Sequence, residues 1–244
     1  MMNILITRPY SSGIKLRDKI SEQIKNINSI IFPAIDIIEK NLPHIDLSQT
    51  DIMIFISPAA VEYSARHIKN IKKSISLFSI GKDTAEKIEK LKLGFDKIIY
   101  PTEKFNSEGL LNLKELKEIN IKNKNIVIFK GQGGNPTLSE ALKARGANVI
   151  EAVVYERRLP KPDSLPDLKN IDLILCTSSE SMNNLIKLLG ETVKEKQLLV
   201  SSERLVSQAK MLGFKYPPLL AQNAGDEALI NVIITSISFS EEHP

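Results

Sequence analysis

The sequence predicts an α/β protein of two similar domains, each built on a doubly wound parallel sheet, with a cleft between them. Three observations support this fold class: a long internal repeat, a regular alternation of strand-like and helix-like segments, and polar turns at the ends of the strand-like segments. Buried parallel strands typically read as continuous apolar runs, as these do. Clefts between two domains are common sites for small molecules.

The repeat aligns the two halves of the chain about 120 positions apart. Four pairs of segments match in the same order: residues 4–8 with 126–130, 55–59 with 175–179, 93–95 with 212–214, and 107–112 with 226–231. A repeat of this length indicates two like domains, because solenoid repeats are shorter, at roughly 20–50 residues.

The first half alternates apolar runs with helical patterns. Apolar runs predict strands at residues 3–7, 31–38, 51–56, 77–80 and 98–100. Apolar residues at helical spacing predict helices at residues 14–27, 59–68, 82–91 and 108–116, the first through Leu16, Ile20, Ile24 and Ile27. Asn106 and Ser107 are suited to cap the last of these helices.

The second half repeats this order. Strands are predicted at residues 126–129, 149–155, 173–176, 198–200 and 219–221, and helices at 137–145, 180–189, 203–212 and 226–237. Gly146, Gly190 and Gly213 follow the first three helices, as helix C-terminal glycines commonly do. The strand-like, proline-bearing stretches 31–38 and 152–160 interrupt the alternation at matched positions and are the best linker candidates.

The composition is that of an ordinary globular protein, with 42% hydrophobic and 25% charged residues in 244. No run approaches the roughly 20 apolar residues that span a bilayer, and no signal-peptide pattern opens the chain. The one cysteine, Cys176, fits a reducing compartment, so we expect a cytoplasmic protein with no membrane association. The net charge of +4 is mild and suits a polyanionic small substrate, and basic stretches without aromatic residues argue against a nucleic-acid partner.

Polar turns follow the predicted strands at six places: Thr7-Arg8, Ser57-Pro58, Gly81-Lys82, Lys130-Gly131, Thr177-Ser178-Ser179 and Ser201-Ser202. In open α/β sheets, ligands bind outside the carboxyl ends of the strands, where helix N-termini offer N–H groups to anions. Each serine or threonine taken alone is better explained as a helix cap. Six such turns in two domains favour a cleft that binds carboxylates or phosphates.

Other chemical signals are weak. The glycine-rich segment 131–134 has neither the dinucleotide spacing nor the Gly-Lys-Ser/Thr of a phosphate loop, and we interpret Gly131 and Gly134 as a tight turn open to an acidic ligand. His44, His67 and His243 show no metal-ligand spacing, so we expect no metal site. Cys176 ends an apolar run and fits a core position better than a nucleophile.

Tyr155 lies in a linker-like segment beside Glu156-Arg157-Arg158. It is either an interdomain packing residue or a phenol that faces the cleft. An ordinary tyrosine, with a pKa near 10, is protonated at neutral pH and can donate a hydrogen bond or a proton.

These segments together resemble the uroporphyrinogen-III synthase family. The resemblance is carried by ILITRP (4–9), FISPAAV (55–61), SIGKDTA (79–85), GQGG (131–134) with the following Leu138, Leu142 and RGA (145–147), VVYER (153–157), CTSS (176–179) and DEAL (226–229). It covers essentially the whole chain. Each motif is loose alone, but their order and spacing together are fairly specific.

The resemblance implies two domains joined by a two-stranded ladder in an interleaved chain. Residues 1–33 and 161–244 then form one domain, residues 39–152 form the other, and residues 34–38 and 153–160 are the linker strands. The repeat alone fits a contiguous split near residue 121 equally well.

The resemblance also implies a lyase without cofactor or metal. Such an enzyme cyclises linear hydroxymethylbilane to uroporphyrinogen III, inverting ring D and releasing water, in heme biosynthesis. The family's tyrosine falls on Tyr155, which is the expected catalytic residue and would assist departure of the hydroxyl. The expected contacts to the eight substrate carboxylates are Thr7, Arg8, Ser57, Pro58, Gly81, Lys82, Lys130, Gly131, Gly134, Thr177, Ser178, Ser179 and Ser202.

Some positions depart from the family pattern. Asn135 replaces a residue that is commonly basic in the family, and Ala59 or Ala60 stands where asparagine is frequent. Residues 200–204 lack the second glycine–threonine turn, so Arg204 would make the substrate contact there in place of a threonine. We expect a monomer whose partner is the linear tetrapyrrole, and a transient contact with the preceding or following pathway enzyme stays open.

The alternatives are a two-domain binder of a tetrapyrrole or polycarboxylate that catalyses nothing, and, with less support, a nucleotide-dependent enzyme.

Overall fold

The computed structural model describes residues 1–42, 45–68, 74–92, 95 and 97–242. It divides into two compact units. Unit 1 comprises Met1–Asp36 and Arg158–Pro244, and unit 2 comprises Ile37–Arg157. The matched segment 93–95 of the repeat lies largely outside the described residues.

Unit 1 contains a sheet with the strand order β11-β10-β9-β1-β2, in which all four neighbouring pairs are parallel. Its strands are β1 (Met2–Ile6), β2 (Ile27–Ile31), β9 (Leu173–Cys176), β10 (Gln197–Val200) and β11 (Leu219–Leu220). Numbered within the unit, this is the order 2-1-3-4-5 of a common doubly wound sheet.

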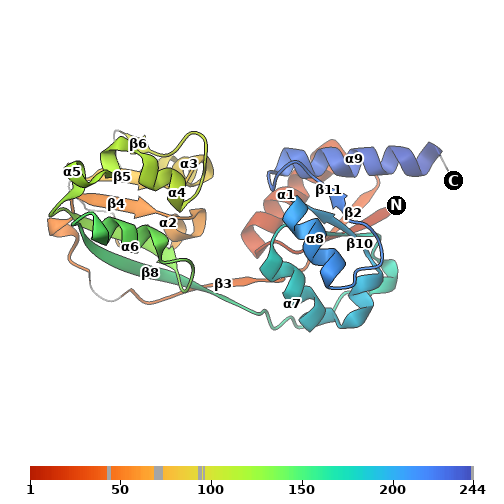
Figure 1. The fold of residues 1–244 in the computed structure, drawn as a ribbon. Coiled ribbons are helices and arrows are strands. Elements are labelled where there is room, and N and C mark those ends of the chain that lie inside the picture. Colours follow the sequence, from red (N-terminus) through yellow and green to blue (C-terminus); the bar gives the residue numbers. More distant parts are fainter. Residues whose placement is uncertain (43–44, 69–73, 93–94, 96, 243–244) are drawn as a thin grey trace. The chain divides into compact units, whose positions relative to one another are not determined.

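Helices cover both faces of the unit 1 sheet (Figure 1). One face packs against α1 (Tyr10–Gln23) and α9 (Asp226–Glu242), and the other against α7 (Ser179–Leu189) and α8 (Glu203–Met211). Because side chains alternate along a strand, Leu5 joins one apolar core while Ile4 and Ile6 join the other. A continuous apolar run is therefore buried on both sides.

Unit 2 contains a sheet with the order β3-β8-β7-β4-β5-β6. Its strands are β3 (Asp36–Glu39), β4 (Ile52–Phe55), β5 (Ser76–Ser79), β6 (Ile98–Ile99), β7 (Asn125–Gly131) and β8 (Asn148–Arg158). The pairs from β8 to β6 are parallel. The chain runs outward from β4 through β5 and β6, and then outward from β7 to β8 on the other side.

The helices of unit 2 also lie on both faces (Figure 1). α2 (Pro58–Ser64) and α3 (Lys82–Lys90) pack on one face. α4 (Ser107–Asn112), α5 (Glu118–Ile121) and α6 (Thr137–Ala144) pack on the other. Short 3-10 turns occupy Leu47–Gln49, Lys114–Leu116, Leu168–Asn170 and Glu191–Glu195.

The structure confirms the α/β class and the parallel sheets, but it corrects several elements. The first helix spans Tyr10–Gln23 rather than residues 14–27, because Pro9 stands at its N-cap and a turn at Asn26, with φ at 63°, leads into β2. The strand expected at 31–38 is two strands, β2 and β3, separated by a loop. The stretch from 149 to 158 is one long strand, β8, and the short helix α5 was not predicted.

Candidate functional site

The carboxyl edge of the unit 2 sheet has a switch point between β4 and β7, from which the chain winds outward in both directions. Ligands of open α/β sheets bind outside the strand carboxyl ends at such a point. Ser57 follows β4, and Gly131 ends β7. The two predicted contacts therefore lie beside each other at the most favourable place in this sheet.

Tyr155 reaches this point because of an irregularity in β8. Lys130 pairs with Val153, but the next residue, Gly131, pairs with Tyr155, so β8 carries one extra residue. A bulge of this kind re-aims the side chains that follow it. It places the Tyr155 ring against Gly131, where an added Cβ would lie 2.5 Å from the ring Cζ.

The Tyr155 hydroxyl lies 3.1 Å from Ser57 Oγ, within hydrogen-bond distance. Ser57 also caps α2, because its Oγ accepts a hydrogen bond from the backbone N–H of Ala60 at 3.0 Å. Pro58 takes the first helical position, which suits a residue without an N–H. The cap fixes the Ser57 hydroxyl in place for Tyr155.

Burial differs between the two residues. Tyr155 exposes only 4% of its surface and belongs to the apolar core that contains Phe55 and Phe129, whose rings are stacked. Its ring lies 6.1 Å from that of Tyr63. Ser57, in contrast, is partly exposed. The phenol is therefore a buried group whose polar end meets a more accessible serine.

Gly81 and Lys82 lie at a second strand end of unit 2, after β5. A Cβ on Gly81 would lie 2.9 Å from the Cβ of Phe105, whose side chain is 57% exposed. The backbone there is extended and unstrained, so the glycine is required by space rather than by conformation. Sequence reasoning missed Phe105, although an aromatic residue in the loop after a predicted strand was a signal that could have found it.

Lys130 and Gly134, the remaining predicted contacts of unit 2, have different surroundings. Lys130 is buried, and its Nζ lies 3.1 Å from a carboxylate oxygen of Glu151. Burial raises the pKa of Glu151, but hydrogen bonds from Ser139 and Lys130 outweigh it and lower the pKa. Gly134 is exposed with φ at 88°, a conformation that favours glycine.

The switch point of the unit 1 sheet lies between β1 and β9, where Thr7 and Arg8 follow β1. Thr7 is buried, and its hydroxyl donates a 2.7 Å hydrogen bond to the carbonyl of Leu175. Arg8 is tied to α9, with Nη1 2.6 Å from Asp226 and a further hydrogen bond to the Ala224 carbonyl. Both side chains thus have protein partners.

The serine and threonine turns of unit 1 act partly as helix caps. Ser178 caps α7 by accepting from the N–H of Ser181 at 3.1 Å, and Thr177 precedes it partly exposed. Arg204 donates a 2.6 Å hydrogen bond to Ser179 Oγ. Ser202 stands at the N-cap of α8 without a side-chain cap hydrogen bond and is partly exposed.

The described residues contain no group of three or more His, Cys, Asp or Glu side chains that could hold a metal. Of the histidines, His44 and His243 lie outside those residues. Cys176 is fully buried, and this burial raises the pKa of its thiol to about 12. Cys176 is thus a core residue, as the sequence predicted. No helix in the same part of the chain is long and apolar enough to span a bilayer.

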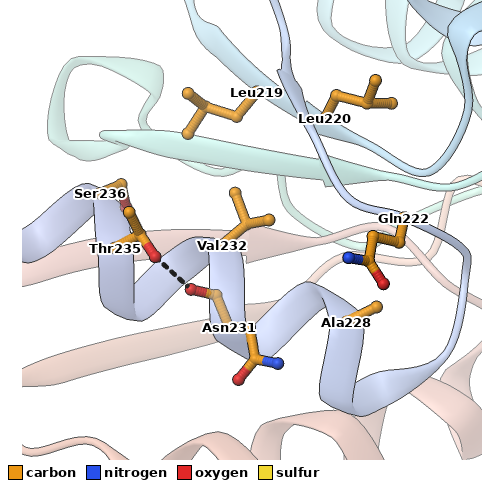
Figure 2. Close-up of a pocket in the computed structure, with 8 residues that line it drawn as sticks. All are labelled: Leu219, Leu220, Gln222, Ala228, Asn231, Val232, Thr235 and Ser236. Carbon is orange, nitrogen blue, oxygen red and sulfur yellow. Dashed lines mark hydrogen bonds between the residues drawn. The ribbon is translucent and has the colours of Figure 1, made fainter.

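A cavity of about 470 Å³ lies in unit 1 between β11 and α9. Figure 2 shows its lining residues: Leu219, Leu220, Gln222, Ala228, Asn231, Val232, Thr235 and Ser236. The Thr235 hydroxyl bonds to its own helix, at the Asn231 carbonyl. None of these lining side chains is charged, so the cavity offers a polycarboxylate no cation.

Comparisons with known proteins give consistent results. The family model described as uroporphyrinogen-III synthase HemD matches residues 18–231. The uroporphyrinogen-III synthase of Salmonella typhimurium is 30% identical over 254 residues, covering 95% of this chain and all of the relative, and that of Escherichia coli K12 is 29% identical with the same coverage.

Two solved structures share the fold. Uroporphyrinogen-III synthetase from Helicobacter pylori 26695 has a TM-score of 0.65 at 14% identity, with 97% of this chain and all of that chain covered. A mutant uroporphyrinogen III synthase from the extremely thermophilic bacterium Thermus thermophilus has a TM-score of 0.56 at 11% identity, with 98% and 99% covered.

Proposed function

Because this chain belongs to the uroporphyrinogen-III synthase family, we propose that it converts linear hydroxymethylbilane into uroporphyrinogen III. The enzyme is a lyase of tetrapyrrole biosynthesis that closes the macrocycle, inverts ring D and releases water. The observation that supports this best within the structure is the pairing of the Tyr155 and Ser57 hydroxyls at a sheet switch point.

The chemistry needs orientation more than strong acids or bases. The lone pair of a pyrrole nitrogen expels the hydroxyl and leaves a delocalised cation, which a substituted pyrrole carbon attacks to give a spiro intermediate. That intermediate fragments and recloses with ring D inverted. Since the free substrate closes unaided without inversion, the enzyme must hold the chain so that inverted closure is faster.

Tyr155 is the proposed catalytic residue, acting on the departing hydroxyl. Ser57, Pro58, Gly81, Lys82, Gly131 and Gly134 are the proposed substrate contacts of unit 2, and Thr7, Thr177, Ser178, Ser179 and Ser202 those of unit 1. Apart from Pro58, which has no N–H, they offer hydroxyl or backbone N–H groups, which bind carboxylates well at helix N-termini. Lys130 and Arg8 stay in this proposal, but a substrate carboxylate would have to displace Glu151 or Asp226 from them.

The proposal extends to the state of the protein. We place it in the cytoplasm, because its single cysteine is a buried free thiol. Its mild charge of +4 suits a polyanionic small molecule. We also propose a monomer, because an enzyme whose two domains each cover their own core needs no partner surface. Sedimentation velocity should give a mass near the chain mass of 27.3 kDa. A stable dimer would contradict the monomer.

Turnover separates the enzyme from a two-domain binder. With substrate in about hundredfold excess over protein, an enzyme consumes all of it faster than the spontaneous closure. A binder protects at most one equivalent and leaves the remainder to close unaided. Loss of substrate at the rate of the protein-free control, with folded protein, would refute the proposal.

A further inference from the structure

We propose that Ser57 donates a proton to the departing hydroxyl, and that Tyr155 in turn donates a proton to Ser57. This inference rests on the proposed function and changes which of the two residues donates its proton directly to the substrate. Ser57 becomes the catalytic residue that touches the substrate, and Tyr155 becomes a positioning residue that acts through Ser57.

Burial gives the first argument. Tyr155 exposes 4% of its surface, and its ring is held between Gly131 and the apolar core, so little room remains for a substrate hydroxyl beside it. Ser57 Oγ, 3.1 Å away, belongs to a partly exposed residue at the carboxyl end of β4. Of the two residues, the more accessible is therefore the serine.

The hydrogen-bond inventory gives the direction of transfer. A serine hydroxyl has one proton to donate and two lone pairs that accept. One lone pair of Ser57 accepts the Ala60 N–H at 3.0 Å. If Tyr155 donates to the other, the proton of Ser57 is left to point outward to a substrate oxygen. The Ala60 N–H also stabilises negative charge that develops on Ser57 Oγ during the transfer.

The step balances without any other reactant. The bond between the hydroxymethyl carbon and its oxygen breaks, and the oxygen keeps the electron pair, takes the Ser57 proton and leaves as water. Ser57 takes the proton of Tyr155, which becomes a phenolate, while the pyrrole nitrogen lone pair forms the new C=N bond of the cation. When the last ring regains aromaticity, the proton lost from its carbon returns to the pair.

Ser57→Gly is the most direct test, because glycine is itself a good N-cap residue and destabilises the helix far less than alanine would. We expect its single-turnover rate for the inverted isomer to fall about 100-fold, the low end of general-acid catalysis. The same rate should fall only about tenfold in Tyr155→Phe, since Ser57 keeps a proton of its own. The double variant should be within about twofold of Ser57→Gly, because the two groups act as one unit.

Two variants serve as controls. Ser57→Thr keeps both the hydroxyl and the cap and should recover most of the rate that Ser57→Gly loses. Asp167→Gly removes a different cap, at Leu168–Asn170 in unit 1, where Asp167 accepts from the Lys169 N–H at 3.0 Å. It should leave the rate unchanged. Circular dichroism confirms that each variant folds.

The sizes of the rate losses in the single and double variants test the order of proton transfer. A rate for Ser57→Gly within about twofold of the unaltered protein, or a double variant whose loss is the product of the two single losses, would overturn the inference. Single-turnover rates in mixtures of light and heavy water should curve with deuterium content, because two protons move, and become linear in Tyr155→Phe. A linear dependence in the unaltered protein would overturn it too. An unaltered protein that makes no inverted isomer would overturn the proposed function itself.

Discussion

Gly131→Ala should disable the Tyr155–Ser57 pair while leaving the fold intact. The new Cβ would lie 2.5 Å from Tyr155 Cζ, 2.6 Å from Cε2 and 2.9 Å from the hydroxyl oxygen. Ordinary contacts of this kind begin near 3.4 Å, so the ring must retreat by about 1 Å. The 3.1 Å hydrogen bond to Ser57 does not survive such a shift in its present geometry.

The expected magnitudes follow from this displacement. A misplacement of about 1 Å in a catalytic group can cost roughly 100-fold in rate. That figure is the upper limit here, because Ser57 keeps a proton of its own when Tyr155 is displaced. Overpacking of a well-packed region typically costs about 1–3 kcal/mol in the free energy of unfolding. We therefore expect the rate of inverted closure to fall about tenfold, as for Tyr155→Phe, while thermal unfolding stays cooperative at a slightly lower midpoint.

The assay compares Gly131→Ala with Gly13→Ala. Gly13 lies in α1 and has a helical backbone. A Cβ added there would lie 3.5 Å from its nearest neighbour, the carbonyl oxygen of Arg8. This control should keep full activity and gain some stability, because alanine favours helix over glycine by up to about 1 kcal/mol. A Gly131→Ala enzyme with unchanged rate and isomer ratio would refute the reasoning that places Tyr155 in the mechanism.

Two further substitutions and one labelling experiment test other features of the protein. Gly81→Ala should push Phe105 aside and raise KM about fivefold, the equivalent of roughly 1 kcal/mol, and an unchanged KM would show that this strand end does not meet substrate. Burial raises the pKa of Asp226, but hydrogen bonds from its two cationic neighbours outweigh it and lower the pKa. Its ion pairs therefore stabilise the fold above the ordinary aspartate pKa and cease to do so as the pH falls through the lowered value. Asp226→Asn should accordingly destabilise the protein by about 1–3 kcal/mol in urea titrations at pH 7 and by less at pH 3, and an equal loss at both would contradict this. Cys176, with its pKa raised to about 12 by burial, should resist thiol reagents until the protein is denatured, and fast labelling at neutral pH would show that unit 1 opens readily.

The internal repeat predicted more of the topology than any local pattern. Matching residues 4–8 with 126–130 pairs β1 with β7, and matching 55–59 with 175–179 pairs β4 with β9. In both sheets these two strands flank the switch point, so unit 2, apart from its edge strand β3, has the strand order of unit 1 in a permuted chain. The repeat signal is strong here because central strands are buried on both faces and tolerate few residue types.

Other features could not be predicted because they depend on long-range register. The extra residue in β8 that sets Tyr155 over Gly131 leaves no mark in an apolar run. The same holds for the ion pair of Lys130, whose partner Glu151 comes from the neighbouring strand β8. A lysine after a strand suggests a ligand contact from sequence alone, whereas only the pairing of β7 with β8 reveals its protein partner.

The isomer ratio of the product tests the central claim most directly. Purified protein is incubated with fresh hydroxymethylbilane at neutral pH, the products are oxidised, and porphyrin isomers I and III are separated by chromatography. The account predicts mostly isomer III, against almost only isomer I without protein. A ratio equal to that of the protein-free control, with protein shown to be folded, would contradict it.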